Sequence, residues 1–327
     1  MSEKLLEIKD ERLSFFTPAG EVKALNGVSF SMEEGEVLGI VGESGSGKSV
    51  TAYSIMGLTA YPGKLVGGTV HFNGHEIEKM TEKEFRKIRG NEVSIIFQDP
   101  MTSLNPVYTI GNQIVEVILL HTNKTKKEAY ERAKELLELV GINEPTKRLK
   151  QYPHELSGGM RQRVMIAMAL ACNPKILIAD EPTTALDVTI QAQIMRLLKQ
   201  LQEKMGTSII LITHDLGIVA QIAKHVMVMY CGQAVEYSDV RSIYKNPLHP
   251  YTAGLLRSIP KLTDDDMEEL PSIPGMVPSP SEKLQGCRFA PRCEKCGARC
   301  KKEMPDLVTL EDGRKVRCFL YEGGVEG

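Results

Sequence analysis

The chain has 327 residues, a formal net charge of -2 and 42% hydrophobic residues, which is typical of a globular protein with more than one domain. This charge gives no support for nucleic-acid binding driven by net charge, so no nucleic-acid partner is expected. No apolar run approaches the ~18 residues of a transmembrane helix, and the first residues lack the apolar core of a signal peptide. Any membrane role is therefore expected to go through a partner.

Residues 42–49 read Gly-Glu-Ser-Gly-Ser-Gly-Lys-Ser, a complete G-x-x-x-x-G-K-[ST] phosphate-binding loop. The apolar run 37–41 predicts a buried strand before the loop, and residues 49–56 predict the start of a helix whose dipole faces an anion. Glycines allow positive φ, so consecutive N–H groups can point at phosphate oxygens. Lys48 is expected to neutralise the β- and γ-phosphates, and the Ser49 hydroxyl to ligate Mg²⁺. The predicted ATP-binding residues here are Gly42, Glu43, Ser44, Gly45, Ser46, Gly47, Lys48, Ser49 and Val50.

The middle of the chain changes from mostly helical to alternating strand and helix. Within residues 99–172 we expect helices at 110–121, 126–140 and 159–171. Beyond them, strands are expected at 175–179, 208–213 and 226–230, with a helix at 189–204. That alternation predicts a parallel sheet with helices on its faces, and hence an α/β fold class.

An apolar run at residues 176–179 ends in two carboxylates, Asp180 and Glu181. Apolar residues bury such a strand, and its end projects the acids toward bound phosphates. Asp180 is therefore predicted to hold Mg²⁺, directly or through water, and Glu181 to polarise the attacking water.

After Pro260 the composition changes. Residues 263–269 are acidic, and prolines follow at 271, 274, 278 and 280, which predicts a linker or extended segment. The last ~65 residues hold too little apolar surface for a core of their own, so we expect them to be stapled or to dock on the main domain. The expected domains are 1–260, with a helical subdomain at about 99–172, and a small Cys-rich extension at 261–327.

Seven cysteines predict thiols or a metal site rather than disulfides. Cys172 and Cys231 lie in apolar stretches and are interpreted as small core residues. Five others cluster near the end of the chain: Cys287, Cys293, Cys296, Cys300 and Cys318. Four thiolates satisfy either tetrahedral zinc or an iron–sulfur cluster, and the Cys293-x-x-Cys296 pair alone would suggest zinc.

The string Leu-Ser-Gly-Gly at 156–159, ahead of the acidic strand, resembles the signature of ATP-binding-cassette (ABC) ATPases. The resemblance implies an ABC-type P-loop NTPase core with an α-helical subdomain. It also implies that Gln98 contacts Mg²⁺ and senses the γ-phosphate, that His214 is the switch histidine, and that Asp187 belongs to the D-loop. Ser157, Gly158 and Gly159 then cap the ATP of an opposite subunit. Phe15 is favoured over Phe16 for stacking on the adenine.

Further strings resemble the dipeptide, oligopeptide and nickel subfamily of ABC importer ATPases, and its D-type subunit in particular. They are Ser-Leu-Asn-Pro at 103–106, His-Pro-Tyr-Thr at 249–252, Ile-Pro-Gly at 273–275, and the stretches 105–114 and 286–293. In this subfamily a four-cysteine pattern, here Cys287, Cys293, Cys300 and Cys318, implies a 4Fe-4S cluster. Cys296 is additional, and the choice of the fourth ligand stays open.

The resemblance implies an ATP-hydrolysing motor subunit of a dipeptide or oligopeptide importer, bound peripherally at the cytoplasmic side of the membrane. Because the chain has one set of nucleotide motifs, it supplies half of a two-site sandwich. The implied partners are a second ATPase subunit (F-type or another copy), two membrane-spanning permease subunits and an extracellular or periplasmic solute-binding protein. The alternatives are the same motor serving nickel or another small solute, a non-transport ABC ATPase acting on DNA or ribosomes, and an iron–sulfur electron carrier or sensor.

Overall fold

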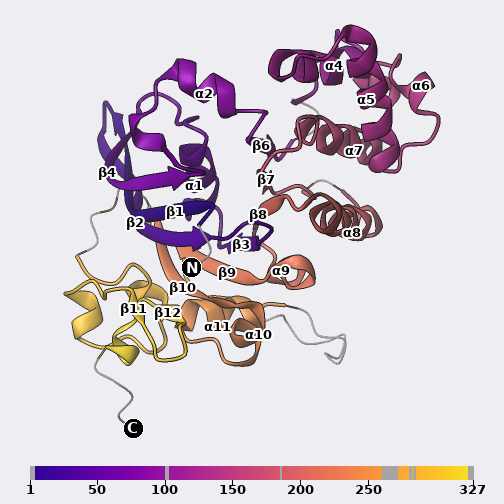
Figure 1. Cartoon of the computed structure of the whole chain (residues 1–327). Helices are drawn as coiled ribbons and strands as arrows, with labels where there is room; N and C mark the ends of the chain where they lie inside the picture. Colours follow the sequence, from indigo (N-terminus) through magenta and orange to yellow (C-terminus); the bar gives the residue numbers. More distant parts are fainter. Residues whose placement is uncertain are drawn as a thin grey trace. The chain divides into compact units, whose positions relative to one another are not determined.

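The computed structural model describes residues 4–99, 103–184, 186–259, 272–279, 282 and 285–322. The chain divides into two compact units, each built from several stretches of sequence (Figure 1). One contains residues 33–37 and 79–212, and the other contains residues 4–32, 38–78 and 213–327. The acidic residues 263–269 and Pro271 and Pro280, assigned to a linker from the sequence, lie outside the described residues.

The first unit is built on parallel strands, with β6 pairing β7 and β7 pairing β8. Every residue of β7 and β8 is buried, as expected of parallel strands that are covered on both faces. The strands are β6 (Val93–Ile96), β7 (Ile176–Asp180) and β8 (Ser208–Thr213), whose last residue falls in the second unit. The strand predicted at 208–213 is therefore confirmed to the residue, and the strand predicted at 175–179 is found one residue later, at 176–180.

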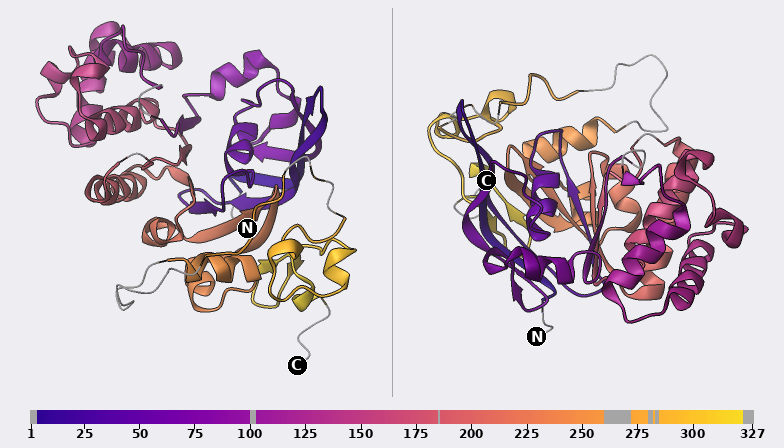
Figure 2. Two further views of the ribbon diagram at one scale, coloured as in Figure 1. Left: turned by 180° about the vertical axis from the view of Figure 1, so that it is seen from behind. Right: turned by 90° about the horizontal axis from the view of Figure 1, so that it is seen from above.

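Helices α4, α5, α6 and α7 of the first unit form one group, which the views of Figures 1 and 2 show together. Capping residues explain where they begin: Thr109, Thr125 and Ser157 accept hydrogen bonds from the first turns of α4, α5 and α7. The unit's helices are α2 (Glu82–Ile88), α4 (Ile110–His121), α5 (Lys126–Leu139), α6 (Pro145–Arg148), α7 (Gly158–Ala169) and α8 (Val188–Met205). The predicted helix at 110–121 is confirmed to the residue, and the others shift by one or two residues at their ends.

The second unit contains an antiparallel sheet in the order β2-β1-β4-β5 and further strands that run β3-β9-β10-β12-β11. β3 and β9 are parallel, whereas β9, β10, β12 and β11 pair antiparallel. The strands are β1 (Leu6–Thr17), β2 (Gly20–Met32), β3 (Val37–Val41, of which residues 38–41 belong here), β4 (Gly63–Phe72), β5 (His75–Glu76), β9 (His225–Tyr230), β10 (Gln233–Asp239), β11 (Val308–Thr309) and β12 (Lys315–Val316). The helices are α1 (Lys48–Ile55), α9 (Leu216–Ile222), α10 (Val240–Lys245) and α11 (Pro250–Arg257).

The described part of the C-terminal segment docks on this second unit instead of forming a core of its own, as the low apolar content predicts. Strand β12 lies beside β10 (Figure 1) and extends the sheet there, with Glu236 pairing with Val316. Phe289 is 3% exposed and packs its ring against Tyr230, His249 and Tyr251. Short 3₁₀ turns connect these contacts, at Ala290–Arg292, Arg299–Lys301 and Phe319–Tyr321.

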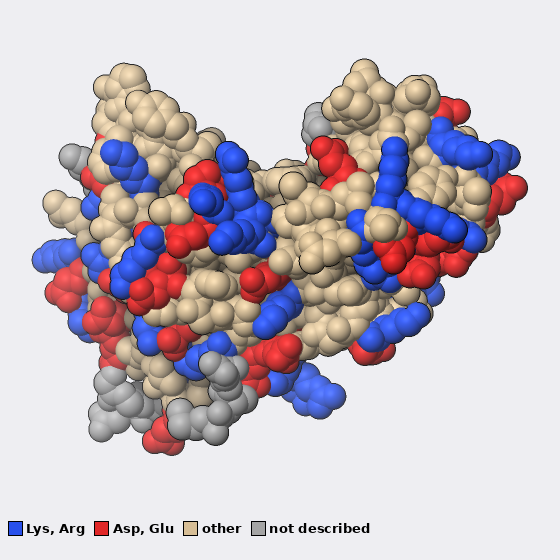
Figure 3. All heavy atoms as spheres, turned by 45° about the horizontal axis from the view of Figure 1, so that its top comes forward, with Lys and Arg blue, Asp and Glu red and all other residues tan. Residues whose placement is uncertain are grey.

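Acidic and basic side chains alternate over the face drawn in Figure 3, so this face carries no field of a single sign. Among the described residues, no helix is both long enough and apolar enough to cross a membrane.

Candidate functional site: the nucleotide motifs and a cysteine-lined cavity

The phosphate loop lies in the second unit, between β3 and α1, and its backbone geometry requires glycine. Gly42, Gly45 and Gly47 have φ of 154°, 77° and 99°, in the region that side chains disfavour. A Cβ on Gly42 would come within 2.2 Å of the Met229 carbonyl oxygen. The loop therefore follows a path that only glycine permits at position 42, as its motif predicts.

Lys48 closes the loop on itself. Its Nζ donates to the carbonyl oxygens of Gly42 at 2.8 Å and Glu43 at 3.0 Å, and the residue is only 6% exposed. Gly47 is the N-cap of α1, and Thr51 N–H donates to its carbonyl oxygen. The lysine ammonium thus lies inside the loop, at the N-terminus of a helix. The positive charge of the ammonium and the helix N-terminus both favour an anionic ligand.

The two candidate adenine-stacking residues differ in exposure. Phe16 is 46% exposed, while Phe15 is half-buried and pairs with Val22 and Gly63 on the neighbouring strands. A Cβ on Gly63 would approach the Phe15 ring to 2.7 Å, so the glycine gives this ring its space. These contacts belong to the sheet and do not decide which ring meets a nucleotide.

In the first unit the structure brings together two predicted catalytic residues that are far apart in the sequence. Gln98, which follows β6, donates its side-chain amide to Glu181 Oε2 at 3.0 Å. The Thr184 hydroxyl donates to the same oxygen at 2.9 Å. Glu181 has a φ of 46° and donates its backbone N–H to Ile212. Two donors on one oxygen and a constrained backbone fix the orientation of this carboxylate.

The other predicted residues take separate positions. Asp180 ends the buried strand β7 in the first unit and is 2% exposed. Ser157 and Asp187 are exposed N-caps of α7 and α8, accepting from the N–H groups of Met160 and Ile190. Gly158 is exposed beside Ser157, and Gly159 packs near Ile190. His214 is exposed in the second unit, directly after β8.

Comparisons with known proteins agree with this geometry. A family model described as "ABC transporter" matches residues 25–184, and one described as "Oligopeptide/dipeptide transporter, C-terminal region" matches residues 235–300. The oligopeptide transport ATP-binding protein AppD of Bacillus subtilis is 55% identical over 97% of this chain and 97% of its own length. The chain belongs to the ABC transporter ATP-binding protein family. The oligopeptide transport protein OppD of Escherichia coli is 52% identical, over 97% of this chain and 94% of its own.

Solved structures agree with the family assignment. The dimeric ATP-binding cassette MJ0796, in a post-hydrolysis state bound to ADP and Pi, matches with a TM-score of 0.65 and 30% identity. This match covers 72% of the chain and 99% of MJ0796. The ABC-type α/β fold predicted from the motifs is therefore confirmed, and this ATP-binding subunit is an ATPase.

A cavity of about 210 Å³ lies in the C-terminal part of the second unit, and four of the five clustered cysteines line it. These are Cys287, Cys293, Cys300 and Cys318, the four that the resemblance selects, and Cys296 is absent from the lining. Burial, with smaller contributions from the other three thiols, raises the pKa of Cys318 to about 11. Among the described residues, no three His, Cys, Asp or Glu side chains are arranged to hold a single metal ion.

Cys172 and Cys231, interpreted from the sequence as core residues, are only half-buried. Burial raises the pKa of both thiols, that of Cys231 to about 11.

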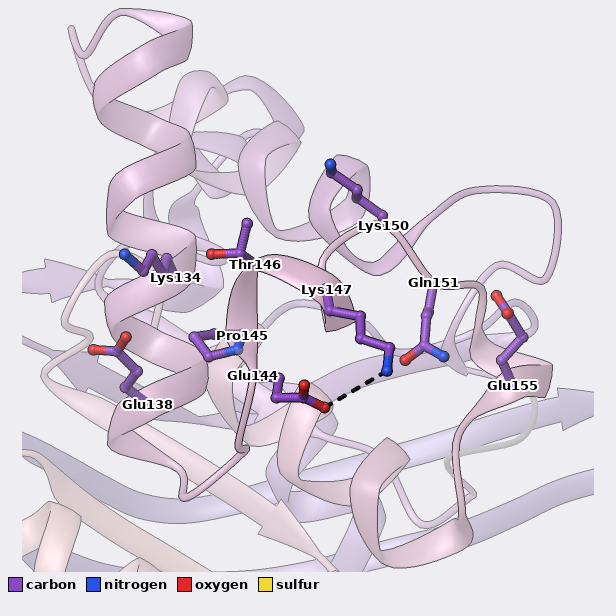
Figure 4. Close-up of a pocket in the computed structure, with 9 residues that line it drawn as sticks. All are labelled: Lys134, Glu138, Glu144, Pro145, Thr146, Lys147, Lys150, Gln151 and Glu155. Carbon is purple, nitrogen blue, oxygen red and sulfur yellow. Dashed lines mark ion pairs between the residues drawn. The ribbon is translucent and has the colours of Figure 1, made fainter.

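A broader hollow of about 660 Å³ lies in the helical group of the first unit (Figure 4). Charged side chains of both signs surround it, and Glu144 and Lys147 form an ion pair of 3.7 Å at its edge. No residue predicted to bind nucleotide lines it, so it is not a candidate for the ATP site. Its lining residues are Lys134, Glu138, Glu144, Pro145, Thr146, Lys147, Lys150, Gln151 and Glu155.

Sequence reasoning missed three residues at these sites. Thr184 donates a hydrogen bond to Glu181 and so orients its carboxylate. Thr184 lies only three residues after Glu181, and this short separation is a signal from which Thr184 could have been predicted. Tyr251 and Arg292 both contact Glu43 of the phosphate loop, from 208 and 249 residues away. No local pattern links residues at such separations.

Proposed function

We propose that this ATPase is the motor subunit of an importer for dipeptides or oligopeptides, bound peripherally at the cytoplasmic side of the membrane. The observation that carries the proposal is similarity to proteins named for oligopeptide and dipeptide transport over almost the whole chain, the C-terminal region included. This region lies outside the residues that the general ABC model matches. The same names support peptides over nickel as the solute.

In the proposed reaction, Glu181 is the general base that polarises the water attacking the γ-phosphate. Gln98 and Thr184 position it through their hydrogen bonds to Oε2. Lys48 neutralises phosphate charge, and His214 contacts the γ-phosphate. Mg²⁺, with Ser49, Gln98 and Asp180 as its proposed partners, would neutralise charge that develops on the phosphates.

A second cassette completes the site in this proposal. Ser157 and Gly158 are exposed at the start of α7, which supports a role in capping the ATP of a partner subunit. Asp187 is likewise exposed and would cross to that partner as part of the D-loop. The partner is an F-type chain or a second copy of this one.

The proposed membrane partners are two permease subunits, with a solute-binding protein on the other side of the membrane. Exposed apolar side chains before α4 and in its last turn support a docking role. Val107 is 71% exposed, Tyr108 is 52% exposed and Leu120 is 75% exposed.

We propose further that the cysteine-lined cavity holds a 4Fe-4S cluster. Four thiols surround one cavity, which matches the four thiolates that such a cluster requires. The resemblance to the peptide-importer subfamily favours the cluster, and tetrahedral zinc, which four thiolates also satisfy, is the alternative. Cys287, Cys293, Cys300 and Cys318 are the proposed ligands, and Cys296 is not one.

The test of transport uses the complex that co-purifies with this chain from detergent-solubilised membranes, reconstituted into liposomes with its solute-binding protein. We expect ATP-dependent uptake of a labelled tripeptide that excess unlabelled tripeptide suppresses. The matched control is the same complex carrying Glu181→Gln, which should assemble without taking up peptide. Uptake of labelled nickel without uptake of peptide would overturn the proposed solute class.

A further inference from the structure

The guanidinium of Arg292 is buried against the phosphate loop. Its side chain is 4% exposed and forms a two-pronged ion pair with Glu43, with Nη1–Oε2 at 2.6 Å and Nη2–Oε1 at 3.1 Å. The remaining donors reach the carbonyl oxygens of Pro274 and Ile273 at 3.0 and 3.2 Å. The carboxylate holds the pKa of Arg292 well above its ordinary value. Such fork-to-fork pairing fixes geometry as well as charge.

Glu43 is the second residue of the phosphate loop, and every part of it is engaged. Its backbone N–H donates to the Tyr251 hydroxyl at 2.8 Å, and its carbonyl oxygen accepts from Lys48 Nζ at 3.0 Å. Arg292 holds the side chain at the same time. The C-terminal part of the second unit therefore contacts the loop through two side chains, one at its backbone and one at its carboxylate.

The same segment forms the wall of the cysteine-lined cavity. Arg292 directly precedes Cys293, and Phe289 lines the cavity while its ring packs on Tyr230 and Tyr251. Arg292 also donates to the Tyr230 hydroxyl, at 3.4 Å. A displacement of the cavity wall would therefore move the two side chains that hold Glu43.

Charge makes this contact matter for nucleotide binding. Glu43 places a carboxylate in the loop proposed to receive a polyanion, and charges act over ~8–10 Å in physiological salt. With Arg292 paired, the carboxylate is compensated. Without the guanidinium, an uncompensated negative charge would remain beside the phosphates, and repulsion would grow with the charge of the nucleotide.

We propose that Arg292 is a positioning residue for the phosphate loop, one that compensates Glu43 and makes ATP affinity depend on the integrity of the cysteine-lined cavity. The first part stands on the ion pair alone. The second part rests on the proposed filling of the cavity by a cluster.

The experiment measures dissociation constants of ATP and ADP for the full-length chain, purified anaerobically, at low and at physiological salt. The variants are Arg292→Met, Arg292→Lys and the double variant Arg292→Met with Glu43→Gln. The matched control is Arg317→Met. Arg317 also precedes a cavity cysteine and anchors the segment, donating to the carbonyl oxygens of Ala234 and Pro305, both at 3.1 Å.

Arg292→Met should raise the dissociation constant of ATP about tenfold, the equivalent of about 1.4 kcal/mol. The increase should be smaller for ADP and should shrink at higher salt, because both reduce the repulsion. Neutralising Glu43 in the Arg292→Met background should restore much of the lost affinity. Arg292→Lys, which keeps the charge without the fork, should fall between the two. If Arg292→Met does not fold, the polar and uncharged Arg292→Gln takes its place, with the same dependence on nucleotide charge and salt.

Two results would overturn the positioning role: an affinity loss in Arg292→Met that depends on salt and nucleotide charge no more than the loss in Arg317→Met, or no rescue by Glu43→Gln. The dependence on the cavity is tested by Cys318→Ser, alone and combined with Arg292→Met. The single variant Cys318→Ser should weaken ATP binding. Added to Arg292→Met it should cause little further loss, because both substitutions act on the same contact between Arg292 and Glu43. Full additivity, or no effect of Cys318→Ser alone, would overturn that dependence. Iron content and peptide uptake are separate measurements, so a failure of the proposed cluster or solute is distinguishable from a failure of Arg292.

Discussion

In the phosphate loop the proposed ligand-binding groups come from eight consecutive residues, whereas the cysteine-lined cavity gathers side chains from distant stretches around 249, 287–300 and 318. The loop depends on backbone conformation, with three glycines at positive φ and a lysine folded back on carbonyl oxygens. The cavity depends on side chains that only the docked segment brings together. The phosphate loop should therefore be sensitive to an added atom, such as a Cβ on one of its glycines. The cavity should instead be sensitive to the loss of one of the side chains that line it.

The proposed hydrolytic pair is also assembled, because Gln98 and Glu181 meet across 83 residues of sequence. Glu181→Gln should give the largest effect, slowing ATP turnover of the assembled complex by at least ~10²-fold, the usual scale for a lost general base. ATP binding should remain, since the amide keeps the size of the side chain. Single-turnover hydrolysis beside nucleotide titration checks this, and turnover near the parent rate would remove Glu181 as the base.

Gly42→Ala tests the local site. A Cβ there would lie 2.2 Å from the Met229 carbonyl oxygen, on a backbone with φ of 154°, so the loop must move. With strain of about 1–3 kcal/mol, ATP binding should weaken by roughly one to two orders of magnitude.

Gly45→Ala is the matched control for that prediction. Gly45 has a φ of 77°, yet an added Cβ would meet no atom within 4 Å. It should weaken binding less than Gly42→Ala in the same titration. Equal losses would show that positive φ alone, and not the close approach to Met229, explains the need for glycine.

The cysteines test the assembled site. Anaerobically purified protein should be brown, with iron and sulfide near four each per chain. Replacing any one of the four cavity cysteines by serine should remove the colour; these are Cys287, Cys293, Cys300 and Cys318. Cys296→Ser should change neither colour nor iron content, because Cys296 does not line the cavity. Metal analysis and the visible spectrum decide the matter, and stoichiometric zinc without iron would contradict the cluster.

Much of the local backbone around the nucleotide motifs could be predicted because these motifs are short and continuous in the sequence. A glycine-rich loop between a buried strand and a helix specifies its own backbone, and the apolar run before Asp180 specifies a buried parallel strand. The helix at 110–121 was predicted to the residue, since Thr109 caps it and Thr122 ends it. The choice of four cysteines among five came from family resemblance, and the cavity lining agrees with it.

The amino-acid sequence by itself determined a phosphate-binding loop and a buried strand that ends in two carboxylates, because these motifs encode their geometry within a few residues. The ABC assignment came from its resemblance to that family. Tertiary structure alone decided how the C-terminal segment docks, through the pairing of β12 with β10 and the packing of Phe289. It also decided that Arg292 meets Glu43, 249 residues away. Such contacts depend on which surfaces the folded chain brings together, and no periodicity or spacing in the sequence records that choice.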